Sequence, residues 1–377
     1  MKSKRSRFIP EHEIGGTLPR NRKRKYFEAT SRWLWLGAQL GAGVALLAAG
    51  CGTPAAPKDN LDTIVVPIGP ITLVPTVPGY ADSAGWNGLG YAETIRVVDV
   101  NGDGSSDVCG RGAAGISCAT WNGTDNFNTP VNWTSDYGDA GGWNNPQYYS
   151  SIQYGDVNGD GKIDICARAG GGVVCSLSTG SSFAPALQWE AALSDVDGFA
   201  NAAYYTSFRL ADINGDGKAD ACMRGAGGMY CEISNGSNFV SGAAWDSYFS
   251  DANGWSGAAY ANTMMVGDVD GDGLADLCGR GPDGVVCEKG TGSQFVGPAL
   301  NVVDNFSDAN GWSWAPAGDT VRLVPPMDGH DTRICGRGGA GEYCAERVST
   351  KGLFYFAPVV LQSSTFGDDT TFGNNLG

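Results

Sequence analysis

Histidine and basic side chains are scarce in this sequence. Only two of its 377 residues are histidine, and 25 Lys plus Arg stand against 40 Asp plus Glu, which gives a formal charge of −15. This balance argues against a nucleic-acid partner, because nucleic-acid binding needs basic surfaces. The chain also lacks a G-x-S-x-G motif, and only one histidine follows residue 50. No catalytic constellation is visible, so we expect a protein that is not an enzyme.

The first 50 residues have the order of an export signal. Residues 1–32 are basic, and the run from Trp33 to Gly50 carries no charge. Small residues directly before Cys51 resemble the lipobox of bacterial lipoproteins, although Ala48 stands where a lipobox has leucine. The resemblance implies cleavage after residue 50, a lipid on Cys51, a tether over residues 51–61 and location at the cell surface or outer membrane. The alternative is an uncleaved anchor helix.

Removal of the signal would make the chain more acidic. Residues 1–50 contain ten basic and three acidic residues, so 15 Lys plus Arg and 37 Asp plus Glu remain, with a formal charge of −22. Such a surface attracts metal cations and would repel itself without them.

Apart from Cys51, the cysteines predict five disulfides. An even set at one repeated spacing, behind an export signal, indicates an oxidising compartment. A zinc site is disfavoured, because its cysteines usually lie closer together or are joined by histidines. The pairs, each nine residues apart, are Cys109 with Cys118, Cys166 with Cys175, Cys222 with Cys231, Cys278 with Cys287, and Cys335 with Cys344.

Each cysteine pair bounds the pattern C-x-R-x-x-x-G-x-x-C, which predicts a hairpin bridged at its ends. Closing a ring of ten residues would stabilise the fold by roughly 2.7 kcal/mol in the chain-entropy model. We expect the arginine of the pattern to pair with a carboxylate or with carbonyl groups, not with a ligand. These arginines are Arg111, Arg168, Arg224, Arg280 and Arg337.

Five tandem units organise the chain, each opened by an aromatic residue in the pattern D-x-x-G-W/F. The unit starts are Trp86, Trp143, Phe199, Trp255 and Trp312. With 58 glycines, long helices are not expected. Four short strands fit a unit of this length, and four-stranded units repeated radially make a β-propeller.

We therefore predict an all-β propeller of about five four-stranded blades over residues 62–377, with a β-solenoid as the rival architecture. The stretch from Leu61 to Trp86 would supply a strand that closes the ring, a sixth partial blade or a Pro-rich tether.

Four units carry an acidic loop with oxygen-bearing side chains at positions one, three, five and nine and glycine at position six. A calcium ion takes about six to eight oxygen ligands, and alternate residues of a tight loop can direct them to one centre. A plain acidic hairpin is the alternative, but its carboxylates would repel one another. We predict about four Ca²⁺ ions, bound by Asp99, Asn101, Asp103 and Asp107; Asp156, Asn158, Asp160 and Asp164; Asp212, Asn214, Asp216 and Asp220; and Asp268, Asp270, Asp272 and Asp276.

The fifth unit departs from this pattern. Its corresponding positions hold Pro325, Met327, Gly329 and Arg333, so no calcium is expected there. Arg333 would act as a built-in cation where the other units bind metal.

The run D-V-N-G-D-G-x-x-D resembles the FG-GAP or VCBS repeat, which is known from the calcium-bearing propellers of integrin α chains and of several secreted lectins. The loops are not EF-hands, since position twelve lacks the bidentate Glu. The resemblance covers four of the five units and implies the fold and the loops, while it says little about the ligand.

The predicted function is a surface-tethered binding module for carbohydrate. An aromatic face can stack on a sugar ring while nearby polar groups bond its hydroxyls. The repeat of this chain also resembles that of propeller lectins, as described above. The competing interpretation of the aromatic residues is core packing between blades. Alternative functions are a protein-binding adhesin or scaffold and, less favoured, a polysaccharide lyase-type enzyme. The candidate ligand-binding residues are Trp86, Trp143, Trp255 and Trp312.

Overall fold

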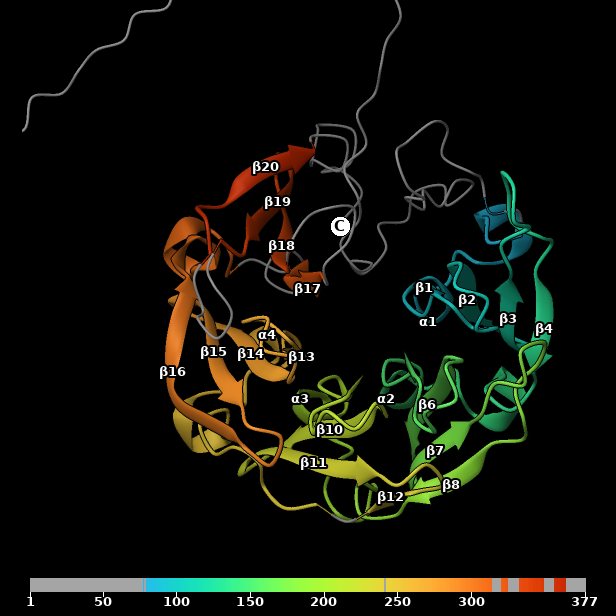
Figure 1. Cartoon of the computed structure of the whole chain (residues 1–377), viewed down its shortest axis with the longest axis horizontal. Coiled ribbons are helices and arrows are strands. Elements are labelled where there is room, and N and C mark those ends of the chain that lie inside the picture. Colours follow the sequence, from blue (N-terminus) through green and yellow to red (C-terminus); the bar gives the residue numbers. More distant parts are fainter. Residues whose placement is uncertain are drawn as a thin grey trace, which may run out of the picture. The chain divides into compact units, whose positions relative to one another are not determined.

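The computed structural model describes residues 77, 79–240, 242–313, 320–324, 332–348 and 356–363. These residues form five four-stranded antiparallel sheets, arranged as the blades of a β-propeller (Figure 1). The prediction of an all-β propeller of about five four-stranded blades is confirmed. Within the described residues, no helix is long and apolar enough to cross a membrane. The predicted signal, Cys51 and the tether lie outside them.

In each blade the strands follow the chain from the inner to the outer edge of the sheet. The first blade consists of β1 (Arg96–Val98), β2 (Asp107–Gly112), β3 (Gly115–Ala119) and β4 (Val131–Thr134). The second has β5 (Gln153–Gly155), β6 (Asp164–Ala169), β7 (Gly172–Ser176) and β8 (Leu187–Glu190). The third has β9 (Arg209–Ala211), β10 (Asp220–Gly225), β11 (Gly228–Ser234) and β12 (Phe239–Val240). The fourth has β13 (Met265–Gly267), β14 (Asp276–Gly281), β15 (Gly284–Gly290) and β16 (Phe295–Val303). The fifth has β17 (Arg322–Val324), β18 (Arg333–Gly338), β19 (Gly341–Glu346) and β20 (Val360–Ser363).

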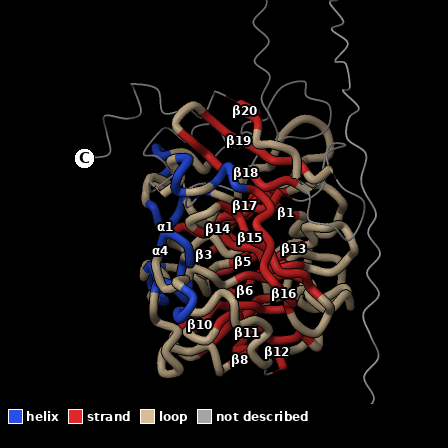
Figure 2. The backbone as a smooth tube through the Cα atoms, turned by 90° about the vertical axis from the view of Figure 1, so that its left-hand side faces the viewer, coloured by secondary structure: helices blue, strands red, loops and turns tan. Residues whose placement is uncertain are grey.

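Short helices lie before the inner strands, on one side of the sheets, which we call the helical face (Figure 2). Four of the 3₁₀ helices end at a glycine with positive φ, for example Gly85 at 91° and Gly142 at 86°. This is the glycine of D-x-x-G-W, and it is needed because a side chain disfavours left-handed backbone. The helices are η1 (Asp82–Ala84), α1 (Leu89–Ala92), η2 (Asp139–Gly141), α2 (Pro146–Tyr149), α3 (Ala202–Tyr205), η3 (Asp251–Asn253), α4 (Ala258–Ala261), η4 (Asp304–Phe306) and η5 (Asp308–Asn310).

The two middle strands of every blade form a tight hairpin that a disulfide bridges. In the first blade Cys109 pairs in register with Cys118, and Gly112 with Gly115. A Cβ atom on Gly115 would lie 2.0 Å from the carbonyl oxygen of Thr134, so glycine is required at this turn. All five predicted disulfides are present.

The hydrophobic core is divided among the contacts between neighbouring blades. Between the first and second blades, for example, Ile116 and Trp133 pack with Trp143 and Ile165, and similar clusters join the other consecutive pairs. Burying such a side chain contributes about 1.5–3 kcal/mol. In the part of the chain that the structure describes, the first and fifth blades share no such cluster.

Candidate functional site

Each acidic loop connects the inner strand of a blade to the second strand, and the aspartate at position one shapes it. In the first loop, Asp99 accepts hydrogen bonds from the backbone N–H groups of Gly102, Asp103 and Gly104. The other three loops repeat these bonds. Hydrogen bonds within the loop therefore fold it around its carboxylates.

The aspartate at position nine is buried and joins the acidic loop to the rest of its blade. Asp107 accepts from the backbone N–H groups of Val100 and Trp121. Burial, together with the nearby Asp103 and Asp99, raises the pKa of Asp107 to about 6. The equivalent residues of the other three loops are shifted in the same direction. A cation beside such a carboxylate would favour its ionised form.

The donor atoms of the fourth loop fit a calcium ion. Carboxylate oxygens of Asp268, Asp270 and Asp276 lie within 4.8 Å of one another. Two oxygens bound to one calcium at about 2.4 Å cannot lie further apart than about 4.8 Å. The first three loops offer an amide oxygen of Asn at position three instead. The residues present therefore match the chemistry of calcium, and its binding stays a prediction.

Lysine side chains balance the charge of three loops. In the second and third loops, the lysine at position seven forms an ion pair with the aspartate at position five. In the fourth loop, Lys289 contacts both Asp270 and Asp272. This loop has Asp270 where the other three have Asn, so its additional carboxylate is accompanied by an additional lysine.

The fifth blade differs at the same place. Arg333 begins β18, the position of the ninth-position aspartate in the other blades, and it is buried. Pro325, Met327 and Gly329 lie outside the described residues. The role of Arg333 as a built-in cation stays a prediction.

A second recurring set of polar side chains lies near the helical face. The Arg111 side chain is fully buried, donates from Nε to the carbonyl oxygen of Tyr137 at 2.9 Å, and forms an ion pair with Asp139. The hydroxyl of Tyr91 donates to the second carboxylate oxygen of Asp139 at 2.6 Å. The guanidinium carbon lies 5.2 Å from the centre of the Tyr91 ring. The expected pairing of this arginine with a carboxylate and a carbonyl is confirmed.

This arrangement, which we call the Tyr–Asp–Arg cluster, occurs four times. The aspartate is the one that opens the next D-x-x-G-W/F pattern, so the residue that marks a unit also ties it to the preceding blade. The four aspartate side chains are 31–34% exposed, whereas the arginines are not exposed at all. The tyrosines are half-buried. The clusters are Tyr91, Asp139 and Arg111; Tyr148, Asp195 and Arg168; Tyr204, Asp251 and Arg224; and Tyr260, Asp308 and Arg280.

Sequence reasoning did not single out these tyrosines as site residues. Their hydroxyl groups reach the cluster aspartate over a separation of 47 or 48 residues, so no local pattern shows the contact. The signal that was available is their recurrence at the period of the units, within the Tyr-rich stretch before each acidic loop.

The four tryptophans proposed from the sequence as ligand-binding residues are buried. Trp86, Trp143, Trp255 and Trp312 are between 5% and 8% exposed and belong to the core. The first three pack edge to face against the tyrosine of a cluster, at ring-centre distances of 6.0–6.2 Å. Burial favours the competing interpretation, core packing between blades. Sugar stacking on these rings stays a prediction. It would need an exposed ring face, whereas little of each packed ring is exposed to solvent.

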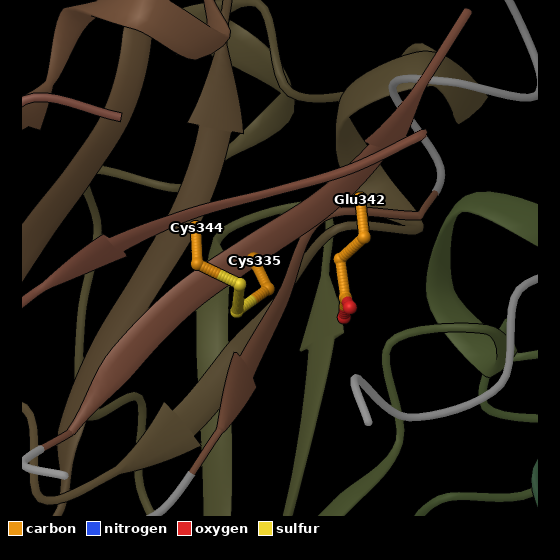
Figure 3. Close-up of side chains that lie close together, drawn as sticks. All are labelled: Cys335, Glu342 and Cys344. Atoms are coloured by element: carbon orange, nitrogen blue, oxygen red, sulfur yellow. A yellow bond between two sulfur atoms is a disulfide. The ribbon is translucent and has the colours of Figure 1, made fainter. Parts of the chain in front are cut away.

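Three side chains that can be metal ligands also lie close together on the fifth blade, namely Cys335, Glu342 and Cys344 (Figure 3). The two sulfur atoms form a disulfide, so they are not thiolate ligands. Glu342 is buried at the register position opposite Arg337, where the other blades have an apolar side chain such as Ile116. We assign no metal to this group.

Comparison with known proteins supports the fold. Residues 156–223, which span the second and third acidic loops, match the FG-GAP-like repeat family. A lectin of Agrocybe aegerita that recognises non-reducing terminal N-acetylglucosamine is 24% identical, with a TM-score of 0.61 over 82% of this chain and 76% of the lectin chain. The Tc holotoxin pore of Photorhabdus luminescens is 17% identical over 71% of this chain and 12% of the toxin chain, with a TM-score of 0.44. No curated protein matches. The protein is thus a β-propeller, and its residues 156–223 are similar to the FG-GAP-like repeat.

Proposed function

We propose that this protein is a calcium-stabilised binding module for carbohydrate, tethered to the cell surface through a lipid on Cys51, and that it acts without catalysis. The observation that carries the proposal is the fourfold Tyr–Asp–Arg cluster near the helical face. The fold likeness to a lectin that recognises a terminal sugar supports the same ligand class.

The chemistry of one cluster suits a sugar. The buried arginine fixes the position of the aspartate, whose carboxylate keeps about a third of its surface in solvent. A carboxylate accepts hydrogen bonds from sugar hydroxyls, and a tyrosine ring packs against the apolar face of a pyranose. Because the arginine and tyrosine already hold the carboxylate, little side-chain freedom would be lost on binding.

Repetition of the cluster suggests a polymeric ligand. A single shallow site of this kind would bind with a dissociation constant on the order of 1 mM, or roughly −4 kcal/mol. Linked copies raise the effective concentration for the next contact when the ligand is itself repetitive. We therefore expect a polysaccharide as the natural ligand class.

The test compares polymer and monomer binding by the calcium-loaded protein in a glycan array, with free sugar as competitor, followed by calorimetry. Changing Tyr91, Tyr148, Tyr204 and Tyr260 to Ala one after another should weaken polymer binding in compounding steps. Tyr91→Phe is the matched control for the ring, since it removes only the hydroxyl group.

Two results would decide against this function. If the folded wild-type protein binds no glycan polymer, carbohydrate binding is wrong and a protein partner becomes the better hypothesis. If the tyrosine variants stay folded and bind as the wild type does, the ligand contacts another surface.

Trp143→Ala addresses the tryptophans separately, because a low melting temperature with unchanged ligand affinity would identify Trp143 as a core residue only.

A further inference from the structure

Hydrogen bonds connect the position-nine aspartates of the first and second acidic loops. In the first loop, the backbone N–H of Val100 donates to the carboxylate of Asp107 at 3.2 Å. The carbonyl oxygen of Val100 accepts a hydrogen bond of 2.5 Å from the hydroxyl of Ser178, which belongs to the second blade. The backbone N–H of Ser178 donates in turn to the carboxylate of Asp164 at 2.7 Å. A chain of three hydrogen bonds therefore joins two predicted calcium ligands.

The same chain continues from the second loop to the third. The backbone N–H of Val157 donates to Asp164 at 3.0 Å, and its carbonyl oxygen accepts from the hydroxyl of Ser234 at 2.5 Å. The backbone N–H of Ser234 donates to Asp220 at 2.7 Å. Ser178 and Ser234 are only 5% and 2% exposed. Hydrogen bonds are stronger in such a buried environment than in water.

A second connection between these loops runs through the backbone alone. Ile163, at position eight of the second loop, donates its N–H to the carbonyl oxygen of Asp99 in the first loop at 3.2 Å. Ala219, at position eight of the third loop, donates to the carbonyl oxygen of Asp156 in the second at 2.7 Å. Both acceptors are position-one aspartates, whose side chains fold the loop. Each bond thus ends at the residue around which the preceding loop is built.

The fourth loop lacks both connections to the third. Gly290 has the place of the two serines, and its N–H donates to Asp276 at 2.8 Å, but it carries no hydroxyl group. A Cβ atom on Gly290 would lie 1.9 Å from the carbonyl oxygen of Ala275, so a serine does not fit there. Among the described residues, no backbone hydrogen bond joins Ala275, at position eight, to Asp212. The side chain of Leu274 lies close to the third loop, so the two loops are neighbours without these bonds.

We propose that Ser178 and Ser234 are positioning residues that couple the first three loops, so that these bind calcium cooperatively while the fourth binds independently. The inference rests on the calcium binding proposed above. An ion in one loop would restrict the backbone of that loop, and the hydrogen bonds would hold the facing part of the next loop in place. The next ion would then restrict less conformational freedom on binding, which produces positive cooperativity.

The test is hydrogen-exchange mass spectrometry of the full chain at increasing calcium concentration, which follows each loop separately. Asp156→Asn disables the second loop, and Asp268→Asn is the matched change in the fourth. Coupling between sites is reciprocal and typically changes an affinity by about fivefold or more. Asp156→Asn should therefore raise the calcium concentration that protects the first and third loops by about fivefold or more. Asp268→Asn should leave the first three loops unchanged.

Variants of Ser178 test the link between the first and second loops. Ser178→Ala should reduce the effect that disabling the second loop has on the first loop, but not the effect on the third. Ser178→Thr keeps a hydroxyl group and should preserve the coupling. Ser151→Ala is the matched control for a lost buried hydroxyl, because Ser151 bonds backbone groups of Tyr148 and Arg168 outside the loops. It should lower the stability without changing the coupling.

The proposal is wrong if Asp156→Asn leaves the first and third loops as they are in the wild type. It is also wrong if Asp156→Asn and Asp268→Asn shift the remaining loops equally, because that would be an effect on overall stability. Full coupling in Ser178→Ala would rule out the serine as the link. If calcium protects no loop, both this proposal and the predicted calcium binding are wrong, whereas loops that bind calcium independently contradict this proposal alone.

Discussion

Buried arginine side chains show how strongly single residues depend on a partner in this protein. A charge removed from water is unfavourable unless hydrogen bonds and an opposite charge compensate it. Arg168 is fully buried and has both, a carbonyl oxygen of Leu193 at 3.0 Å and the carboxylate of Asp195. Removing the carboxylate should therefore destabilise the fold more than an ordinary surface substitution would.

Asp195→Ala should lower the free energy of unfolding by about 3 kcal/mol or somewhat less, since a third of Asp195 is exposed. Asp82→Ala is the matched control, because Asp82 has the same place in its unit but forms no ion pair with a described residue. Urea unfolding measures both. Equal midpoints for the two variants would contradict a stabilising role of the Arg168 pair.

The buried carboxyl group of Glu288 should make the protein less stable as the pH rises from about 4.5 to about 8. Burial, followed by the hydrogen bond and the charge of Asp246, raises the pKa of Glu288 from 4.5 to about 8. The folded protein therefore favours the protonated carboxyl group, so this contribution to stability is complete below about pH 4.5 and is lost as the pH rises towards 8.

Glu288→Gln should accordingly raise the melting temperature at pH 8 and make it less dependent on pH, while Asp125→Asn, at an exposed position, should not. Scanning calorimetry from pH 5 to pH 9 measures the effect. Parallel profiles for the wild type and the Glu288 variant would show that the buried carboxyl group is not the cause.

Single-residue roles were predictable where they depend on nearby sequence and not where they depend on another blade. The cysteines and the turn glycines recur at fixed local spacing, so their roles followed from the pattern. Trp143, for example, packs in one cluster with Ile116 of the preceding blade, 27 residues earlier in the sequence, and periodicity does not show which face of the ring is covered. The carboxyl pair of Glu288 and Asp246 likewise joins two blades.

Among the elements, the acidic loops give the sharpest test of metal binding. Wild-type protein should contain four calcium ions per molecule by elemental analysis, and Asp164→Asn should contain three, because position nine of the second loop loses its charge. If each site is filled at about one hundred times its dissociation constant, it stabilises the fold by roughly 2.7 kcal/mol. A chelator should lower the melting temperature of the wild type accordingly. Purified protein that binds no calcium would contradict this expectation.

Hairpins could be predicted from sequence because the cysteines and glycines that define them are neighbours in the chain. Helices of three or four residues could not, since so short a helix has no stability of its own and forms where the surrounding blades hold it. In α2, for example, Asn145 accepts from the N–H of Gln147 and Pro146 opens the turn, a signal too short to distinguish from a loop.

At the scale of the whole molecule, the 56- or 57-residue period predicted about five blades, and the structure has five. It did not determine how the ring ends meet. In the fifth blade, Glu342 replaces the apolar residue that packs against the next blade in the other units, such as Ile116. Repetition alone therefore does not show what covers this side of the fifth blade.

Attachment to a membrane is a property of the complete chain. If Cys51 carries a lipid, mass spectrometry of the native protein should find it as the modified N-terminal residue, and Cys51→Ala should move the protein from the membrane fraction to the soluble one. A variant that keeps its membrane location would indicate the uncleaved anchor helix instead.

The placement of the five disulfides has a mechanical consequence. Each one closes a ring within a single hairpin, across a separation of nine residues, and none joins two blades. Under tension applied at the chain ends, roughly 45 residues of each unit would remain free to extend, on the order of 150 Å at about 3.3 Å per residue. The molecule would lengthen blade by blade, while the five disulfide-closed hairpins would stay closed. These hairpins would serve as starting points for refolding once the tension was released.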